Sequence, residues 1–148
     1  MICFAFQGTC IALDELLFHR KRLLPRWELI GHPMDTFFFA GFFLALRLGR
    51  PEDRASQAIT ISLGLLSCLI ITKDEWVHKR LATAAENWLH AVLFLLHPIV
   101  VVLFWFGWRS EQTDFASILQ LAQIMTGLFF IYQIVDGGRR WSRIEMRS

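Results

Sequence analysis

The chain has few charged residues for its length, and its basic residues form no stripe of their own. Only 19% of its 148 residues are Asp, Glu, Lys or Arg, and the formal net charge is +2. Because nucleic-acid binding depends on a dense patch of basic side chains, this class of partner is excluded. Internal repeats and low-complexity linkers are also lacking, so the sequence predicts one domain over residues 1–148.

Several motifs that carry chemistry in other proteins are missing. The three cysteines, Cys3, Cys10 and Cys68, have no C-x-x-C spacing and lie in apolar segments, which argues against a disulfide framework or a zinc knuckle. There is no glycine-rich phosphate loop, and no serine lies beside a histidine, as would suit a serine hydrolase. The N-terminus lacks the basic region and cleavage site of a signal peptide, so we expect it to be retained.

Long apolar runs dominate the chain instead. Apolar residues make up 55% of it, with 14 Phe and 6 Trp. Five apolar segments lie at about 2–18, 34–48, 56–72, 88–108 and 115–135. Because backbone groups in lipid must be bonded internally, the segments are predicted to be helices. The sequence therefore predicts an all-α integral membrane protein, a bundle of about five transmembrane helices, or four if the first segment lies on the membrane surface.

The basic residues are distributed unevenly along this topology. With five spans, one side of the membrane receives eleven of the fifteen Lys and Arg residues. They are Arg20, Lys21, Arg22, Arg26, Lys73, Lys79, Arg80, Arg139, Arg140, Arg143 and Arg147. The positive-inside rule then predicts that the N-terminus is outside and the C-terminus cytoplasmic.

The segment from Thr72 to Pro98 is the most informative part of the sequence. If it is helical, at about 100° per residue its acids and histidines fall on one stripe roughly 120° wide. The stripe contains Glu75, His78, Glu86, His90 and His97. His97 lies among residues of lipid depth, where an ionisable side chain is costly and indicates function.

Other acids and histidines come from distant parts of the chain to the same predicted layer of the membrane. Glu15 and His19 are four residues apart, with Asp14 offset; His32 and Asp35 flank a proline that suits the first turn of the second span; and Asp136 closes the fifth span before two glycines. This convergence predicts a metal site or a proton relay. The candidate metal ligands are Glu15, His19, His32, Asp35, Glu75, His78, Glu86, His90, His97 and Asp136.

Two of these spacings resemble known metal sites. Glu75-x-x-His78 resembles the motif of bundle-core di-iron and di-manganese proteins, although those proteins carry the motif twice. The spacing of Glu15, His19 and His32 is similar to that of a copper triad in membrane methane monooxygenases, in which the first residue is Asp. The predicted cofactor is a divalent metal, with iron favoured over zinc and with copper or manganese as alternatives.

The sequence thus predicts a small membrane metalloprotein that is an oxidoreductase or, with zinc, a hydrolase. The candidate catalytic residues are Glu75, His97 and Tyr132. Its expected partners are membrane lipids, a lipid-soluble substrate and further copies of the chain or a larger membrane complex. The alternatives are a transporter or channel for divalent metals or protons, and an accessory subunit whose charges only dock partners.

Overall fold

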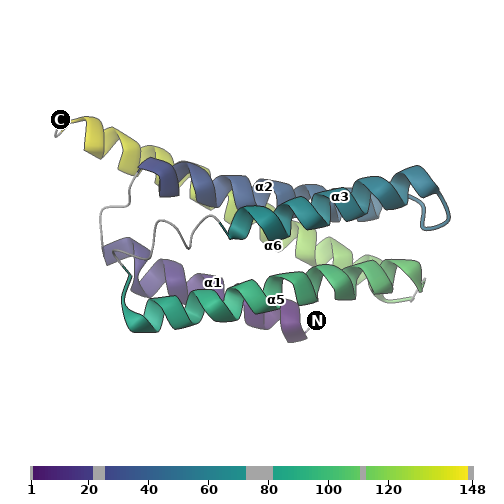
Figure 1. The fold of residues 1–148 in the computed structure, drawn as a ribbon. Coiled ribbons are helices and arrows are strands. Elements are labelled where there is room, and N and C mark those ends of the chain that lie inside the picture. The colour runs from purple at the N-terminus through teal and green to yellow at the C-terminus, as the bar shows by residue number, and fades with distance from the viewer. Residues whose placement is uncertain (1, 22–25, 73–81, 111–112, 147–148) are drawn as a thin grey trace.

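The computed structural model describes residues 2–21, 26–72, 82–110 and 113–146. Within these ranges the chain forms five α-helices and one short 3-10 helix, and it contains no strand. The helices run up and down along one bundle (Figure 1). They are α1 (Ile2–Leu17), η1 (His19–Lys21), α2 (Arg26–Leu48), α3 (Arg54–Ile71), α5 (Ala84–Arg109) and α6 (Phe115–Glu145).

Four helices of the described chain are long and apolar enough to cross a membrane, namely α2, α3, α5 and α6. The fifth, α1, has 16 residues and packs lengthwise against α5 instead of lying across the end of the bundle (Figure 1). Large apolar side chains such as Leu65, Leu95 and Leu128 are exposed along the bundle, as lipid-facing residues are. The prediction of an all-α membrane-spanning protein is confirmed.

The half of the bundle that contains the α2–α3 connection has an apolar core. Phe42, Phe43, Phe104 and Trp108 are buried there together with aliphatic side chains. Phe4 of α1 packs edge-on against the rings of Phe43 and Phe104, with centroids 5.9 and 5.8 Å apart. Such aromatic pairs stabilise a fold beyond the area that they bury. The other half of the bundle is different, because its interior contains acids and histidines.

Helix boundaries differ from the sequence prediction at two places that matter for this interior. The second span begins at Arg26, about two turns before the predicted start, so that Pro33 lies inside α2 and not in its first turn. α6 continues through Gly137 and Gly138 to Glu145, so Asp136 does not close the helix. The two differences meet in space: Pro33 cannot bond the Leu29 carbonyl, and Gly137 lies against that oxygen. α6 therefore passes beside the Leu29 carbonyl, which lacks its usual helical hydrogen bond.

The segment from Thr72 to Pro98 is not one continuous helix, so the condition for a single stripe of acids and histidines along it is not met. α3 ends at Ile71 with Thr72 as its C-cap. α5 begins at Ala84, where Thr83 is the N-cap of a capping box with Glu86. Thr83 and Glu86 form the T-x-x-E pattern that starts helices, and this local signal determines where α5 starts. Glu75 and His78 lie outside the described residues.

Candidate metal centre

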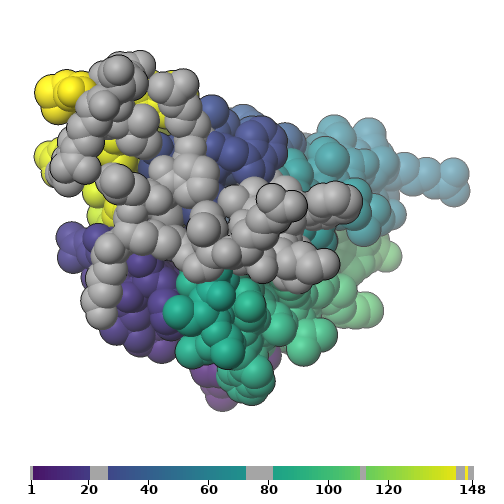
Figure 2. All heavy atoms as spheres, turned by 60° about the vertical axis from the view of Figure 1, so that its left-hand side comes forward, coloured from purple at the N-terminus to yellow at the C-terminus, as the bar shows by residue number. Residues whose placement is uncertain are grey.

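Helices α1 and α6 end, and α2 and α5 begin, at one end of the bundle (Figure 1). These segments and η1 carry the acids and histidines of the candidate site. Figure 2 shows this end, with α1 in purple beside the start of α5 in green, and the end of α6 in yellow beside the start of α2 in dark blue. Four segments that are distant in the sequence therefore deliver side chains to one place.

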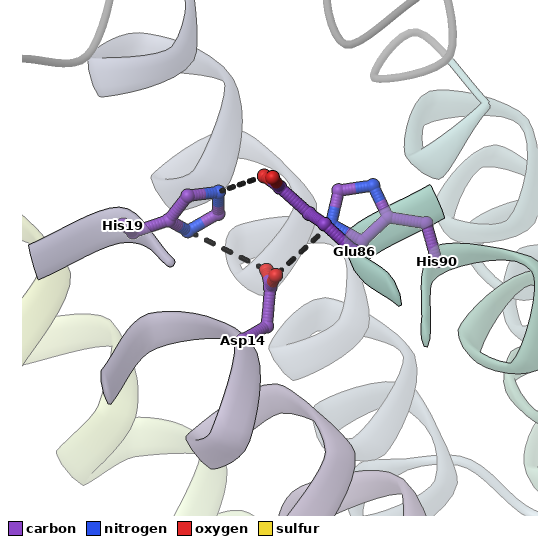
Figure 3. Close-up of side chains that lie close together, drawn as sticks. All are labelled: Asp14, His19, Glu86 and His90. Atoms are coloured by element: carbon purple, nitrogen blue, oxygen red, sulfur yellow. Dashed lines mark hydrogen bonds and ion pairs between the residues drawn. The ribbon is translucent and has the colours of Figure 1, made fainter. Parts of the chain in front are cut away.

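One group of four buried residues comes from α1, η1 and α5 (Figure 3). His19 Nδ1 lies 3.4 Å from Asp14 Oδ2, and His19 Nε2 lies 3.9 Å from Glu86 Oε1. His90 Nε2 lies 3.1 Å from Asp14 Oδ1. All four side chains point toward one another, and none of the four residues is more than 6% exposed. Each residue places one ligand atom within 4.8 Å of the others.

A second group shares His19 with the first. It adds Glu28 and His32 from the first turns of α2, again with ligand atoms within 4.8 Å of one another. Glu28 is buried, and His32 is partly buried. The rings of His19 and His32 lie with their centroids 4.8 Å apart. Together the two groups contain three carboxylates and three imidazoles.

The spacing of these ligand atoms is close to that of a coordination shell. With metal–ligand bonds of about 2.1 Å, two ligands on opposite sides of an ion are about 4.2 Å apart. Imidazole nitrogen and carboxylate oxygen are ligands for iron, manganese, zinc and copper. The buried cluster could therefore hold a metal ion with only small shifts of its side chains.

The capping box of α5 holds one of the candidate ligands in place. Glu86 Oε2 accepts a hydrogen bond from the Thr83 backbone N–H at 3.4 Å, and the Glu86 N–H donates to Thr83 Oγ1 at 3.3 Å. The other carboxylate oxygen, Oε1, is the atom that faces His19. The hydrogen bonds that start α5 therefore also orient Glu86 toward the cluster.

Polar side chains of α6 hold the α1 side of the cluster. Arg140 donates to Glu15 Oε1 at 3.1 Å and to the backbone carbonyl of His19 at 2.7 Å, and it forms an ion pair with Asp136. The Tyr132 hydroxyl donates to the same Glu15 oxygen at 2.9 Å. Glu15 Oε2 lies 3.6 Å from His19 Nδ1. Contacts of this kind fix the orientation of metal ligands in known sites.

A cavity of about 90 Å³ lies beside the cluster, toward the middle of the bundle. Asp14, His19, His32 and His90 line one part of it, and His97 lines another. His97 is held on both sides. Gln7 Nε2 donates to its Nδ1 at 2.7 Å, so the ring proton is on Nε2, which donates to Ser67 Oγ at 2.6 Å. The cavity wall therefore contains the candidate metal ligands at one part and the hydrogen-bonded His97 at another.

The structure places the predicted ligands in three settings. His19, His32, Glu86 and His90 belong to the two groups described above. Glu15, Asp35 and His97 line the adjoining cavity, while Asp136 pairs with Arg140. Glu75 and His78, the pair with the di-iron-type spacing, lie outside the described residues. Of the other candidate catalytic residues, His97 lines the cavity and Tyr132 contacts Glu15.

Two residues of the groups were not among the predicted ligands. Asp14 was set aside because it is offset from the Glu15–His19 pair. Glu28 was missed because the second span was expected to begin near residue 34. A signal was present, since Glu15–His19, Glu28–His32 and Glu86–His90 all have the pattern Glu-x-x-x-His. Three such pairs in a chain with only five histidines would have identified Glu28.

The chain matches no model of a protein family, no curated protein and no solved structure. Its function must therefore be inferred from the geometry of the site.

Proposed function

We propose that this membrane-spanning helical protein is a metal-dependent oxidoreductase that acts on a lipid-soluble substrate. The observation that carries the proposal is the pair of overlapping groups at one end of the bundle, Asp14, His19, Glu86 and His90 with Glu28 and His32. Burying so many ionisable side chains in a membrane bundle is costly, and such residues mark functional sites. A dinuclear centre is the arrangement that uses all six.

The number of ions follows from how the ligand atoms are grouped. They form two sets that share His19, and not one set within a single coordination distance. Dinuclear carboxylate proteins use four inward carboxylates and two histidines in a helical bundle. Here the two groups supply three carboxylates and three histidines, with Glu15 as a further carboxylate beside His19.

The ligand types favour iron. Mixed imidazole and carboxylate ligands are typical of non-haem iron sites, whereas structural zinc sites are rich in cysteine. Cys3, Cys10 and Cys68 are outside both groups. When iron is bound, it supplies O₂-dependent oxidation. Thr83 and Arg140 orient candidate ligands through hydrogen bonds. The helices around the cavity exclude bulk water from it.

Packing in the other half of the bundle favours an enzyme over a transporter or channel. Beyond His97, the interior is closed by Phe42, Phe43, Phe104 and Trp108. A path for ions across the membrane needs polar groups or water along its length. A polar cavity that ends against an aromatic core suits a reaction site better than a conduit.

We further propose that the metal centre lies at the cytoplasmic leaflet, with the N-terminus outside and the C-terminus cytoplasmic. Arg20, Arg139 and Arg140 lie at the end of the bundle where the cluster is found, in agreement with the positive-inside rule. A reporter enzyme fused after Ser148 tests this orientation. Cytoplasmic reporter activity supports it, and activity only on the outer side contradicts it.

Loading with iron tests the proposed chemistry. Purified protein is loaded with Fe(II) without oxygen and then exposed to O₂, and absorption and Mössbauer spectra are recorded. We expect a coupled pair of ferric ions and O₂ consumption, both absent from a Glu86→Ala, His90→Ala double variant. Binding of zinc alone would indicate a hydrolase instead, and the absence of any metal binding would contradict the proposal and favour an accessory subunit.

A further inference from the structure

An apolar groove of about 520 Å³ lies between α1, α2 and α6. It exists because α1 packs mainly against α5 while α6 packs mainly against α2. On α1 it extends from Phe4 to Ala12, about 12 Å at the rise of a helix. Gly8, Ala12 and Met125 along its sides are exposed, so the groove opens toward the surrounding lipid.

The groove adjoins the polar cavity beside the metal centre. Gln7, Ile11, Thr36, Phe39 and Phe129 line both. A molecule lying in the groove is therefore separated from the cavity only by these side chains. The lining of the groove is mostly apolar, whereas the cavity contains the acids and histidines described above.

Gln7 is placed where the groove meets the cavity, and it has one unused acceptor. The residue is 2% exposed. Its Nε2 donates to His97, whereas its Oε1 has no hydrogen-bond partner among the described residues. A buried carbonyl oxygen without a donor costs free energy, and a ligand that carries an O–H group would satisfy it.

We propose that the groove binds a single unbranched alkyl chain that ends in a hydroxyl-bearing group, such as a long-chain alcohol or a protonated fatty acid. The alkyl chain lies between α1 and α6, and the hydroxyl donates to Gln7 Oε1 at the entrance of the cavity. A cavity of about 90 Å³ accepts a small end group but not a phospholipid head group. The inference rests on the proposed function, since it supplies the substrate class for that site.

Photolabelling of the full chain in lipid nanodiscs tests this inference. The probe is hexadecanol with a photoreactive diazirine in its chain, and the labelled residues are mapped by mass spectrometry. We expect labels at Ala12, Met125 and Thr126. Unmodified hexadecanol should compete with the probe, whereas hexadecane, which has no hydroxyl for Gln7, should compete much less.

A variant whose groove is filled by a larger side chain tests the binding site more directly than competition between ligands does. A Cβ added at Gly8 meets no atom of a neighbouring element within 4 Å, and Gly8 lines the groove, so Gly8→Leu places an apolar side chain there from a position with open space. Losing contact with two or more methylenes should reduce labelling about tenfold. The matched control is Gly127→Leu, also a helical glycine with open space around it but not in the groove lining. Ala12→Leu is a second groove variant if Gly8→Leu fails to fold.

The outcomes separate this inference from the proposed function when bound metal is measured in the same samples. Labels spread evenly over lipid-facing residues such as Leu44, Leu65 and Leu69, or labelling unchanged by both groove variants, would overturn the inference even if metal is bound. Labelling of the groove by the probe in a protein that binds no metal would overturn the proposed function and leave the groove as a lipid site.

Discussion

Glu86 illustrates how single residues of this protein serve folding and the site together. One of its carboxylate oxygens completes the capping box of α5, and the other faces His19. His19 in turn faces Asp14 with its second ring nitrogen. The capping box and the contacts between α1, η1 and α5 therefore orient these side chains before any ion binds.

Glu28 is the residue whose substitution separates the two groups. It belongs to the group with His19 and His32 but not to the group with Asp14, Glu86 and His90. We therefore expect Glu28→Gln to remove one of two bound metal ions and leave the other. The measurement is metal content per chain after reconstitution and removal of excess ion.

The control for this prediction is Glu52→Gln, because Glu52 is an exposed acid between α2 and α3. It should bind as much metal as the unaltered protein. Equal metal content in Glu28→Gln and Glu52→Gln would show that Glu28 is not a metal ligand.

The sequence predicted that the histidines of the cluster lie together, but it did not predict which acids contact them. The convergence of His19, His32 and His90 at one level follows from helices whose ends alternate across a membrane. The sequence did not indicate which acids face them, since Asp14 and Glu15 are neighbours that point to different partners. Such a choice depends on how α1 packs against α5 and on the side chains that α6 brings beside it.

At the scale of helices, the start of α5 connects stability with metal binding. Thr83→Ala removes the hydroxyl that accepts the Glu86 N–H. Loss of such a cap typically costs about 1 kcal/mol of unfolding free energy, and a loosened ligand should weaken metal binding by about tenfold. Thermal unfolding and metal titration of the purified protein measure the two effects.

Ser110→Ala is the matched control at the other end of α5. The Ser110 hydroxyl donates to the Gly107 carbonyl, remote from the cluster. It should leave metal affinity unchanged. If both variants lower metal affinity equally, the capping box has no specific role in the site.

Asp53, the N-cap of α3, lies outside the membrane-spanning segments and should make the stability of the fold depend on pH. The backbone N–H and hydroxyl of Ser56 donate to Asp53 and hold the pKa of its carboxyl below 3.8. Because this pKa is lower in the folded than in the unfolded chain, ionised Asp53 stabilises the fold above the unfolded pKa. That contribution is lost as pH falls through the lowered folded pKa.

The unfolding temperature of Asp53→Ala should therefore be below that of the unaltered protein at neutral pH, and the difference should shrink in acid. Unfolding in detergent, followed by circular dichroism at several pH values, measures it. Glu52→Ala should show no such trend. A difference that stays constant with pH would contradict the role of the Asp53 carboxylate.

Helix existence was predictable, whereas helix ends near the site were not. Apolar length identified α2, but Arg26 to His32 are too polar to be recognised as part of a span, and Pro33 suggested a boundary. Likewise Gly137 and Gly138 suggested an end that packing against α2 overrides. Tertiary contacts decide these positions, and a single sequence does not report them.

On the scale of the whole molecule, the bundle divides into an aromatic half and a polar half. The aromatic core of Phe42, Phe43 and Phe104 holds the helices together without the acids and histidines. The polar half can therefore carry residues chosen for binding and not for packing. This division predicts that variants of the cluster still fold.

Elemental analysis of detergent-purified protein, beside the Glu86→Ala, His90→Ala double variant, tests the central claim most directly. The expected result is two equivalents of iron per chain in the unaltered protein and a loss of metal in a double variant that remains folded. Absence of metal from the unaltered protein, even after reconstitution, or equal metal in both proteins, would contradict a metal centre at this cluster.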